Sequence, residues 1–413
     1  MTELLLAATS LDVSPPPGHR LDGYAARTGV AIGTADPLQA TLIWLSTQDD
    51  PGVLWLSLDA IATGAALSAE LAAAAGAAAG ILPSHVVVSA SHTHSGPSGW
   101  TGEIHPIIPA EQEPDLVESL LSAVRAASLQ RRPVKASWRS IEVVGVGTNR
   151  HRRNGPHDNT AGILALHSPS GSLEAVLLDF ACHPTTYGPE NLQYSADWPG
   201  AARAALAPAV VGFLQGAAGD VSPRFTRQGR GAAEVARLGG LLAGRVREAL
   251  AGPGLELPQA APVIRRTTLN LPVRVVPPAD ESEELVAVAE SRVNGTDDPS
   301  GRMSQTRLDG ARGQALMAAA SLPPCLALPV SAVTMGDVCW INLPVELFAL
   351  HGACLQSDST HPITRVIGYT DGYFGYVVDP SAAAAGTYEA LITYFDQPTT
   401  TQLLTQTTTF VNS

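Results

Sequence analysis

Residues 86–100 read VVVSASHTHSGPSGW, an apolar run that leads directly into two histidines and then into a turn rich in glycine and proline. Three consecutive valines followed by small residues are typical of a buried strand. His92 and His94 are two residues apart, so in an extended chain both imidazoles would point to the same side. The stretch therefore predicts a strand whose carboxyl end presents two histidines, at the edge where open α/β sheets commonly bind ligands.

Similar apolar runs recur along the chain and alternate with helical patterns. The predicted strands are residues 40–45, 53–58, 85–90, 175–180, 209–214 and 332–343. The predicted helices are residues 60–81, 114–129, 198–206 and 232–250. Near-continuous apolar strands are usually buried on both faces, and their alternation with helices favours an α/β fold. We expect a mixed sheet with flanking helices.

The domain organisation follows from the absence of sequence boundaries. No linker rich in glycine and serine divides the sequence, and no repeat of fixed period is visible. Residues 1–413 are therefore expected to form one large domain. The stretch 273–312 is the poorest in large apolar residues and carries a run of acids, so we expect it to be an excursion at the surface.

Composition and charge exclude several classes of partner. The 413 residues are 45% hydrophobic and 15% charged, as in a globular protein, and the net charge of −13 opposes binding to nucleic acid. The longest apolar stretch, residues 60–81, is interrupted by polar residues, so no stable membrane insertion is expected. The amino-terminal stretch lacks the basic residues and long apolar core of a secretion signal, which predicts a cytoplasmic protein.

Two common hydrolase motifs are missing from the sequence. A serine hydrolase of the α/β type needs a GxSxG turn, and a metalloprotease of the zincin type needs an HExxH helix. Neither pattern occurs. The candidate chemistry therefore rests on other clusters.

A second histidine follows a second apolar strand. Residues 177–188 read LLDFACHPTTYG, where the apolar run leads into His183. Neutral imidazole is the commonest protein ligand of zinc, and a catalytic zinc site needs about three protein ligands and one open position. Two strands that both end in histidine therefore favour a metal site, the alternative being hydrogen-bonded histidines of the core.

A third cluster combines small residues with an acid and a serine. Residues 213–225 read FLQGAAGDVSPRF, in which an apolar strand ends in small residues and is followed by Asp220 and Ser222. Small residues allow the backbone to approach a ligand closely, which suggests a turn that binds an anion. The alternative is an ordinary turn stabilised by the aspartate side chain.

Taken together, the segments SASHTHSGPSG, ACHPTTYG and GAAGDVSPR resemble the neutral ceramidase family, whose members are zinc amidases that cleave the N-acyl bond of ceramide. Further similarities follow in the same order along the chain: LDVSPPPG, GYAAR, the pair Asn149 and Arg150, SADWPG at 195–200, and NLPVELF at 342–348. The resemblance covers nearly all 413 residues and corresponds to the amino-terminal catalytic domain of that family.

The resemblance implies a set of zinc ligands. His92 and His183 match the zinc histidines of the family, and Glu346 in LPVELF matches its carboxylate ligand. GYFGYVVDP resembles the segment that carries the tyrosine ligand, which makes Tyr376 the fourth ligand. Tyr388 lies twelve residues further on, as does the second active-site tyrosine of the family.

The resemblance also implies roles in catalysis. Zinc would activate a water molecule near neutral pH and polarise the amide carbonyl. His94 would protonate the leaving amine, and Tyr388 or Arg150 would donate hydrogen bonds to the developing oxyanion. Ser222, in the matching GDVSP motif, would have a positioning or hydrogen-bonding role.

The sequence also departs from the family. It stops soon after TYFDQPTTTQLL, so the carboxyl-terminal immunoglobulin-like domain of the ceramidases is expected to be missing, and DPSAAAAG replaces an acidic segment near the expected substrate entrance. These changes favour a small soluble N-acyl compound over ceramide as the substrate. Two other functions remain open: a zinc-dependent esterase, acyltransferase or cyclase of specialised metabolism, and a metal- or lipid-binding relic without activity.

Overall fold

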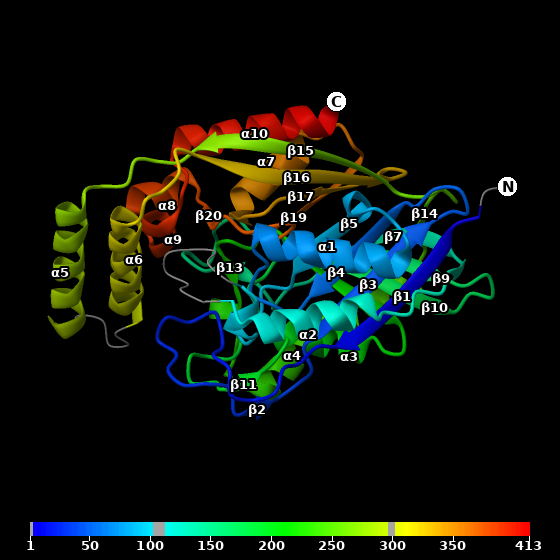
Figure 1. Cartoon of the computed structure of the whole chain (residues 1–413), viewed down its shortest axis with the longest axis horizontal. Coiled ribbons are helices and arrows are strands. Elements are labelled where there is room, and N and C mark those ends of the chain that lie inside the picture. Colours follow the sequence, from blue (N-terminus) through cyan, green and yellow to red (C-terminus); the bar gives the residue numbers. More distant parts are fainter. Residues whose placement is uncertain (1–2, 102–111, 296–301) are drawn as a thin grey trace.

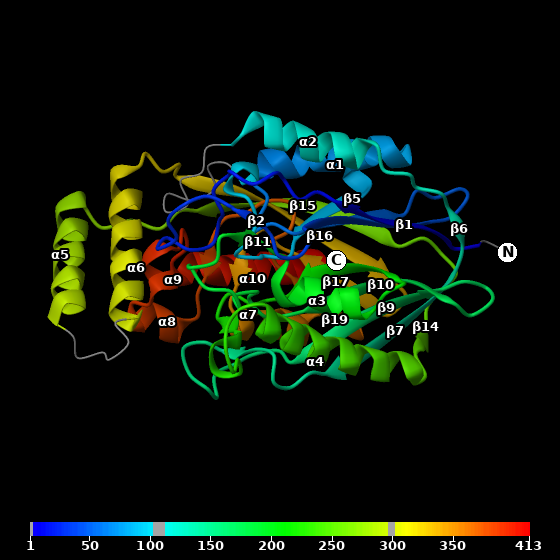
Figure 2. The same ribbon diagram turned by 90° about the horizontal axis from the view of Figure 1, so that it is seen from below.

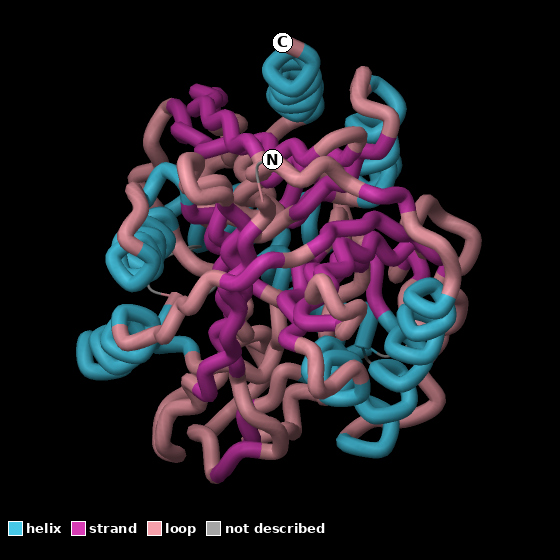
Figure 3. Tube along the Cα trace, turned by 90° about the vertical axis from the view of Figure 1, so that its right-hand side faces the viewer, coloured by secondary structure: helices cyan, strands magenta, loops and turns pink. Residues whose placement is uncertain are grey.

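Three β-sheets meet in the interior of the molecule, and helices lie around them (Figures 1 and 3). The computed structural model describes residues 3–101, 112–295 and 302–413. The strands pair in both parallel and antiparallel directions, so the predicted α/β fold with mixed sheets is confirmed. The fold consists of three layers, and each layer is a sheet with its own helices.

The first sheet has the strand order β5-β4-β3-β1-β6. Its strands are β1 (Leu5–Asp12), β3 (Gln39–Ser46), β4 (Val53–Leu58), β5 (Val86–Ala90) and β6 (Arg132–Pro133). All residues of β4 and β5 are buried, as their continuous apolar sequences predict. These two strands are parallel and are joined by α1 (Ala65–Ala79). The helix is shorter than predicted because Gly64 caps its start and Gly80, with a φ of 71°, ends it.

The second sheet has the order β12-β10-β9-β7-β14. Its strands are β7 (Lys135–Glu142), β9 (Thr160–His167), β10 (Leu173–Phe180), β12 (Val210–Gln215) and β14 (Leu255–Glu256). The parallel strands β10 and β12 are connected through α3 (Asp197–Ala205). Residues of α3 and α4 (Ala232–Ala251) share one apolar core with β9, β10 and β12, so these helices cover one face of the sheet.

The third sheet corrects one prediction. Its strands, in the order β15-β16-β17-β19, are β15 (Val263–Pro272), β16 (Cys325–Met335), β17 (Val338–Asn342) and β19 (Ile363–Ile367). The single strand predicted over 332–343 is in fact an antiparallel hairpin between β16 and β17. The chain reverses at Gly336, whose φ of 58° is a conformation that glycine adopts without steric cost. Helix α7 (Ala349–Asp358) then leads to β19, parallel to β17.

A cluster of three tryptophans joins the sheets at the centre. Trp55 lies on β4, Trp138 on β7 and Trp340 on β17, and all three belong to one buried core. The ring of Trp340 packs edge-on against both others, with centroid distances of 6.1 Å to Trp55 and 5.5 Å to Trp138. Each sheet therefore turns one face toward this shared core.

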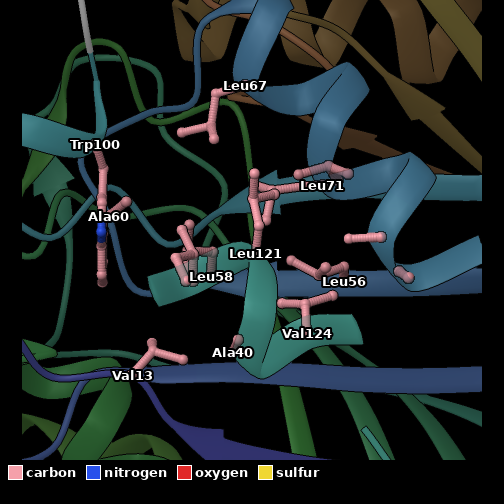
Figure 4. Close-up of a cluster of buried hydrophobic side chains, with 14 of the residues drawn as sticks. Val13, Ala40, Leu56, Leu58, Ala60, Leu67, Leu71, Trp100, Leu121 and Val124 are labelled. Carbon is pink, nitrogen blue, oxygen red and sulfur yellow. The ribbon is translucent and has the colours of Figure 1, made fainter. Parts of the chain in front are cut away.

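The outer face of the first sheet packs against two helices, α1 and α2 (Pro114–Arg125). Figure 4 shows Leu56 and Leu58 of β4 in the same cluster as Leu71 from α1 and Leu121 from α2. On the third sheet, α10 (Gln397–Asn412) and α7 have the same role. Since both faces of each sheet are covered, the chain can bury long runs of apolar sequence.

The expected surface excursion is a pair of helices. Helices α5 (Ala279–Gly295) and α6 (Arg302–Ala319) lie side by side at one end of the molecule (Figures 1 and 2). Helix α6 packs on the short helix α9 (Tyr388–Ile392), and a β-carbon at Gly310 would lie 3.1 Å from Cα of Tyr388. The helix pair therefore packs closely against α9, the helix that carries the candidate site residue Tyr388.

A helix that spans a membrane must be both long and apolar. None of the helices in the described part of the chain is both long and apolar enough to cross a bilayer.

Replacing Trp340 with alanine is expected to lower the free energy of unfolding by about 3–5 kcal/mol, because the change opens a cavity where the three sheets meet. Urea denaturation of the wild-type and variant proteins measures this difference. Val275, which is 92% exposed, provides the control, since its change to alanine should alter stability by less than about 0.5 kcal/mol. Equal stability of the two variants would contradict the central role of the tryptophan cluster.

Candidate functional site

The three sheets deliver side chains to one site. His92 follows the carboxyl end of β5, His183 follows that of β10, and Glu346 follows that of β17 at the start of the short strand β18 (Glu346–Leu347). Isolated bridges from Ser89 to Thr370 and from Gly216 to Ile367 hold the segments together. The site therefore lies where the three layers converge.

The side chains form a buried cluster of nitrogen and oxygen atoms. Oε2 of Glu346 lies 3.3 Å from Nε2 of His92 and 3.1 Å from Nε2 of His183. Nε2 of His94 lies 3.3 Å from Nε2 of His92, and the three histidines each offer a nitrogen within 4.8 Å of the others. Such a group has the composition and spacing of a metal site.

The histidines are oriented by the backbone. Nδ1 of His92 lies 2.6 Å from the carbonyl oxygen of Ile61, and Nδ1 of His183 lies 2.7 Å from that of Ala218. A carbonyl oxygen only accepts, so each Nδ1 carries a proton and each Nε2 faces the cluster. Burial and the nearby Arg150 lower the pKa of His183 to about 4, so this imidazole is neutral at pH 7. The arrangement fits the requirement for deprotonated metal ligands.

The backbone at the site differs from the expected extended strand. Strand β5 ends at Ala90, and His92 has a φ of 64°, in the left-handed region that residues with a β-carbon rarely adopt. Tyr369 has a φ of 54°, and its ring lies 4.2 Å from the ring of His92. His92 and His94 do reach the same cluster, but through this local turn and not through the alternation of a strand.

Two tyrosines that sequence reasoning did not assign to the site hold Glu346. Tyr369 donates a hydrogen bond from its hydroxyl to Oε2 of Glu346 at 3.2 Å, and Tyr373 donates to Oε1. Burial raises the pKa of both phenols, so both remain donors at neutral pH. The only sequence signal was the density of tyrosines in residues 369–376.

Arg150 lies between several predicted residues. Its guanidinium donates to Oε1 of Glu389 at 2.9 Å through Nε and to the hydroxyl of Tyr376 at 3.3 Å through Nη2. Nη1 lies 3.3 Å from Nε2 of His183. The backbone N–H of Arg150 donates to the carbonyl oxygen of Asp220 at 2.7 Å. Arg150 is therefore fixed at the edge of the histidine cluster.

Tyr376 and Tyr388 also reach the site. Strand β20 (Tyr376–Val377) pairs in parallel with β18, which places Tyr376 directly beside Glu346. Tyr388 begins helix α9, and its ring lies 6.2 Å from that of Tyr376. Burial raises the pKa of Tyr376 well above its ordinary value, so its hydroxyl is protonated in the protein without metal.

Asp220 and Ser222 have different surroundings. Asp220 accepts hydrogen bonds from the side-chain amide of Asn149 at 2.6 Å and from the backbone N–H of Ala349 at 2.8 Å, so it ties three segments together. Ser222 is buried, and its hydroxyl accepts a hydrogen bond from the N–H of Arg224 at 3.3 Å. Among the contacts of the described residues, this hydroxyl makes none with the histidine cluster.

The small residues of the GAAGD turn serve the protein backbone. Gly219 donates its N–H to the carbonyl oxygen of Leu347 at 2.9 Å, and a β-carbon there would lie 2.5 Å from the carbonyl oxygen of Glu346. The N–H of Val221 is donated to Ala218. These two N–H groups are thus already used, and the close approach allowed by glycine positions the strand that carries Glu346.

A cavity of about 430 Å³ opens onto the cluster. Its inner part is formed by six site residues: His92, His94, Glu346, Tyr373, Tyr376 and Tyr388. Its outer part is formed by the segment 20–29 and by one face of α6. The volume lies at the lower end of the range for small-molecule sites.

Two solved structures share this fold. Neutral ceramidase from Pseudomonas aeruginosa matches with a TM-score of 0.77 and 16% sequence identity, over 99% of this chain and 74% of that chain. A structure described as ceramidase complexed with C2 matches with a TM-score of 0.76 and 15% identity, over 99% of this chain and 74% of that one. No protein-family model and no curated protein matches the sequence. The expected resemblance to the ceramidase catalytic domain is therefore confirmed for the fold.

Glu389 provides a test of the charges around the site. Burial raises the pKa of this carboxyl, but Arg150 and a hydrogen bond from His151 outweigh burial and lower the pKa to about 2. Because the pKa in the unfolded chain is about 4.3, ionised Glu389 stabilises the fold above this value, and the contribution is lost as the pH falls toward 2. Replacing Glu389 with glutamine is expected to lower the free energy of unfolding by about 3 kcal/mol at pH 7.

The difference between wild type and Glu389→Gln should be constant from pH 7 to about pH 5 and should shrink below about pH 4.5. Urea denaturation at a series of pH values measures it. Glu118→Gln is the matched control, since Glu118 is 63% exposed in its pair with Arg125 and its replacement should leave stability almost unchanged at every pH of the series. A difference for Glu389 that stayed unchanged at pH 3.5 would contradict the lowered pKa.

Proposed function

We propose that the protein is a zinc-dependent hydrolase that cleaves the amide bond of a small N-acyl compound, and that residues 1–413 form one domain for this reaction. The main support is the cluster in which the imidazoles of His92 and His183 meet the carboxylate of Glu346 at the junction of three sheets. The ceramidase fold of the chain adds to it, since two solved structures with this fold are described as ceramidases.

The proposed zinc ligands are His92, His183, Glu346 and Tyr376. Their donor atoms are the types that zinc prefers, and the two histidines are already held with Nε2 toward Glu346. A zinc ion in this position would supply a Lewis acid that activates water near neutral pH and polarises the substrate carbonyl. The hydrogen bonds from Tyr369 and Tyr373 would keep the carboxylate in place.

His94 is the proposed acid and base. It lines the cavity beside His92, and burial lowers its pKa well below the ordinary value, so the ring is neutral before the reaction. In hydrolysis the water oxygen bonds to the carbonyl carbon, the C–N bond breaks, and the amine nitrogen gains a proton. His94 would accept a proton from the water and return it to the leaving amine.

The other polar groups would stabilise the negative charge that develops on the carbonyl oxygen. Arg150 and Tyr388 are the proposed donors, because both lie beside Tyr376 at the inner end of the cavity. Each such hydrogen bond contributes roughly 3–4 kcal/mol to transition-state stabilisation. Ser222 is proposed to position the loop through its contact with Arg224.

The cavity favours a small substrate over ceramide. Its volume of about 430 Å³ leaves little room for two long hydrocarbon chains, and five charged side chains line its outer part. The same site would also suit ester hydrolysis, acyl transfer or cyclisation, and product analysis with a competing amine separates these reactions from amide hydrolysis. A metal- or lipid-binding relic would have no need for His94 and Arg150 beside the ligands.

The zinc proposal predicts about one zinc per chain in the wild-type protein and its loss in His183→Ala. Elemental analysis of purified proteins after resupply of zinc gives the ratio. His361→Ala is the control and should retain zinc, since His361 lies after helix α7, away from the cluster. A wild-type protein that stays free of zinc after resupply would overturn the proposal.

The role of His94 predicts a different result from that of a ligand. His94→Ala should keep zinc and lose about 10²- to 10⁴-fold in kcat on an N-acyl substrate, because the leaving amine is no longer protonated. Zinc content and kcat are measured on the same sample. Loss of zinc would make His94 a third histidine ligand, while retention of both zinc and full kcat would exclude the acid role.

A further inference from the structure

One buried cation in the outer part of the cavity has no acidic partner. Three arginines of the described residues are fully buried: Arg27 is 6% exposed, Arg203 is 7% exposed and Arg365 is 8% exposed. Arg203 pairs with Asp59, and Arg365 pairs with Asp179 at 2.6 Å. Within 3–101, 112–295 and 302–413, no carboxylate lies at ion-pair distance from Arg27, which is the one of the three that lines the cavity.

The two nearest acids are engaged elsewhere. Asp22 and Glu190 are close enough to influence Arg27 electrostatically. However, Asp22 accepts a hydrogen bond from the hydroxyl of Thr101, and Glu190 lies 3.9 Å from Arg230 at the surface. Neither carboxylate neutralises the guanidinium directly.

The guanidinium also has unused donors. Its five N–H groups include one directed to the carbonyl oxygen of Asp22 and one to that of Gly188, at 3.4 Å. Nε finds no acceptor among the described residues. A buried charge without a counter-ion is costly, and an anionic ligand in the cavity would supply the missing counter-charge.

Arg27 lies close to the proposed reacting groups. Its Cζ lies 4.9 Å from the ring centroid of Tyr24, and the Tyr24 ring lies 5.1 Å from that of His94. A single aromatic ring therefore separates the guanidinium from the histidine cluster. Arg20, which is exposed and also lines the cavity, adds a second positive charge to the same wall.

On the opposite wall of the cavity, the charged side chains of α6 are engaged with neighbouring side chains. Arg312 pairs with Glu290 at 2.9 Å, and Asp309 accepts a hydrogen bond from Gln305 at 2.9 Å. The whole chain carries a net charge of −13, which repels anions in general. An anionic ligand would therefore need a local cation, and Arg27 and Arg20 are placed to provide it.

We propose that Arg27, assisted by Arg20, binds a carboxylate of the substrate, so that the preferred substrates are N-acyl compounds with a carboxylate near the scissile amide. The proposal rests on the amide hydrolase function above and specifies its substrate class. The carboxylate belongs either to the amine half, as in an N-acyl amino acid, or to the acyl half, as in a succinamic acid. Arg27 recognises the same group in both cases.

Two substrate pairs test the proposal. The first is N-hexanoylglycine and its neutral amide N-hexanoylglycinamide, and the second is N-hexylsuccinamic acid and N-hexylsuccinamide. In one pair the zinc-loaded wild-type enzyme should prefer the anionic member at least about tenfold in kcat/KM, the typical effect of a charge-assisted hydrogen bond. The pair that shows the preference identifies the half that carries the carboxylate.

Three variants locate the effect. Arg27→Gln should reduce the preference to about threefold or less, while Arg27→Lys, which keeps the charge, should retain part of it. Arg20→Gln, at an exposed position, should reduce the preference partly and covers the case in which Arg27→Gln does not fold. Arg125→Gln on α2, which is 48% exposed, is the matched control and should keep the wild-type preference.

Calorimetric binding of both members of each pair makes the test independent of turnover. Tighter binding of an anionic member to wild type than to Arg27→Gln supports the carboxylate site even if no amide is cleaved, in which case only the hydrolase function fails. Cleavage of both members at equal rates, with equal binding, overturns the carboxylate site and leaves the hydrolase function standing.

Discussion

The convergence of the Glu346 carboxylate and the imidazoles of His92 and His183 on one point is the constraint on which the rest of the site depends. A buried carboxylate is costly unless its oxygens are hydrogen-bonded, and here every neighbouring element contributes to that requirement. Tyrosine hydroxyls hold its oxygens, and backbone carbonyls fix the tautomers of His92 and His183. The left-handed backbone at His92 and Tyr369 is maintained by the same network, as is common at functional sites.

The sequence predicts the parts of this site that follow from local pattern. Apolar runs that end in His92 and His183 identify both strands and both imidazoles, because strand burial and strand ends are visible in short stretches. Glu346 and Tyr376 were assigned by family resemblance alone, since their proximity depends on the pairing of two strands of two residues each. Tyr369 was not assigned to the site because its role depends on a backbone conformation that the sequence does not reveal. The hairpin at Gly336 was missed because apolar residues continue on both sides of the turn.

Two kinds of structure form the walls of the cavity. Its inner end is built by residues that follow strands of the first and third sheets and by Tyr388 of α9, and the shared tryptophan core fixes these sheets. Its outer part is built by the segment 20–29 and by α6, which lie outside the sheets. Changes in the outer part therefore alter the shape and charge presented to a ligand without disturbing the cores, so one arrangement of reacting groups suits different ligands.

The convergence of three layers also has a consequence for the order of folding. His92 and Glu346 are separated in sequence by more than half of the chain, and the strands of the third sheet all lie between residues 263 and 367. Contacts between residues so far apart form late, because the loop they close is long. During synthesis the first two layers can assemble while the third is still being made, so the nascent chain has both histidines but lacks the carboxylate. The complete set of site residues is therefore present only after the third sheet has been synthesised and has folded.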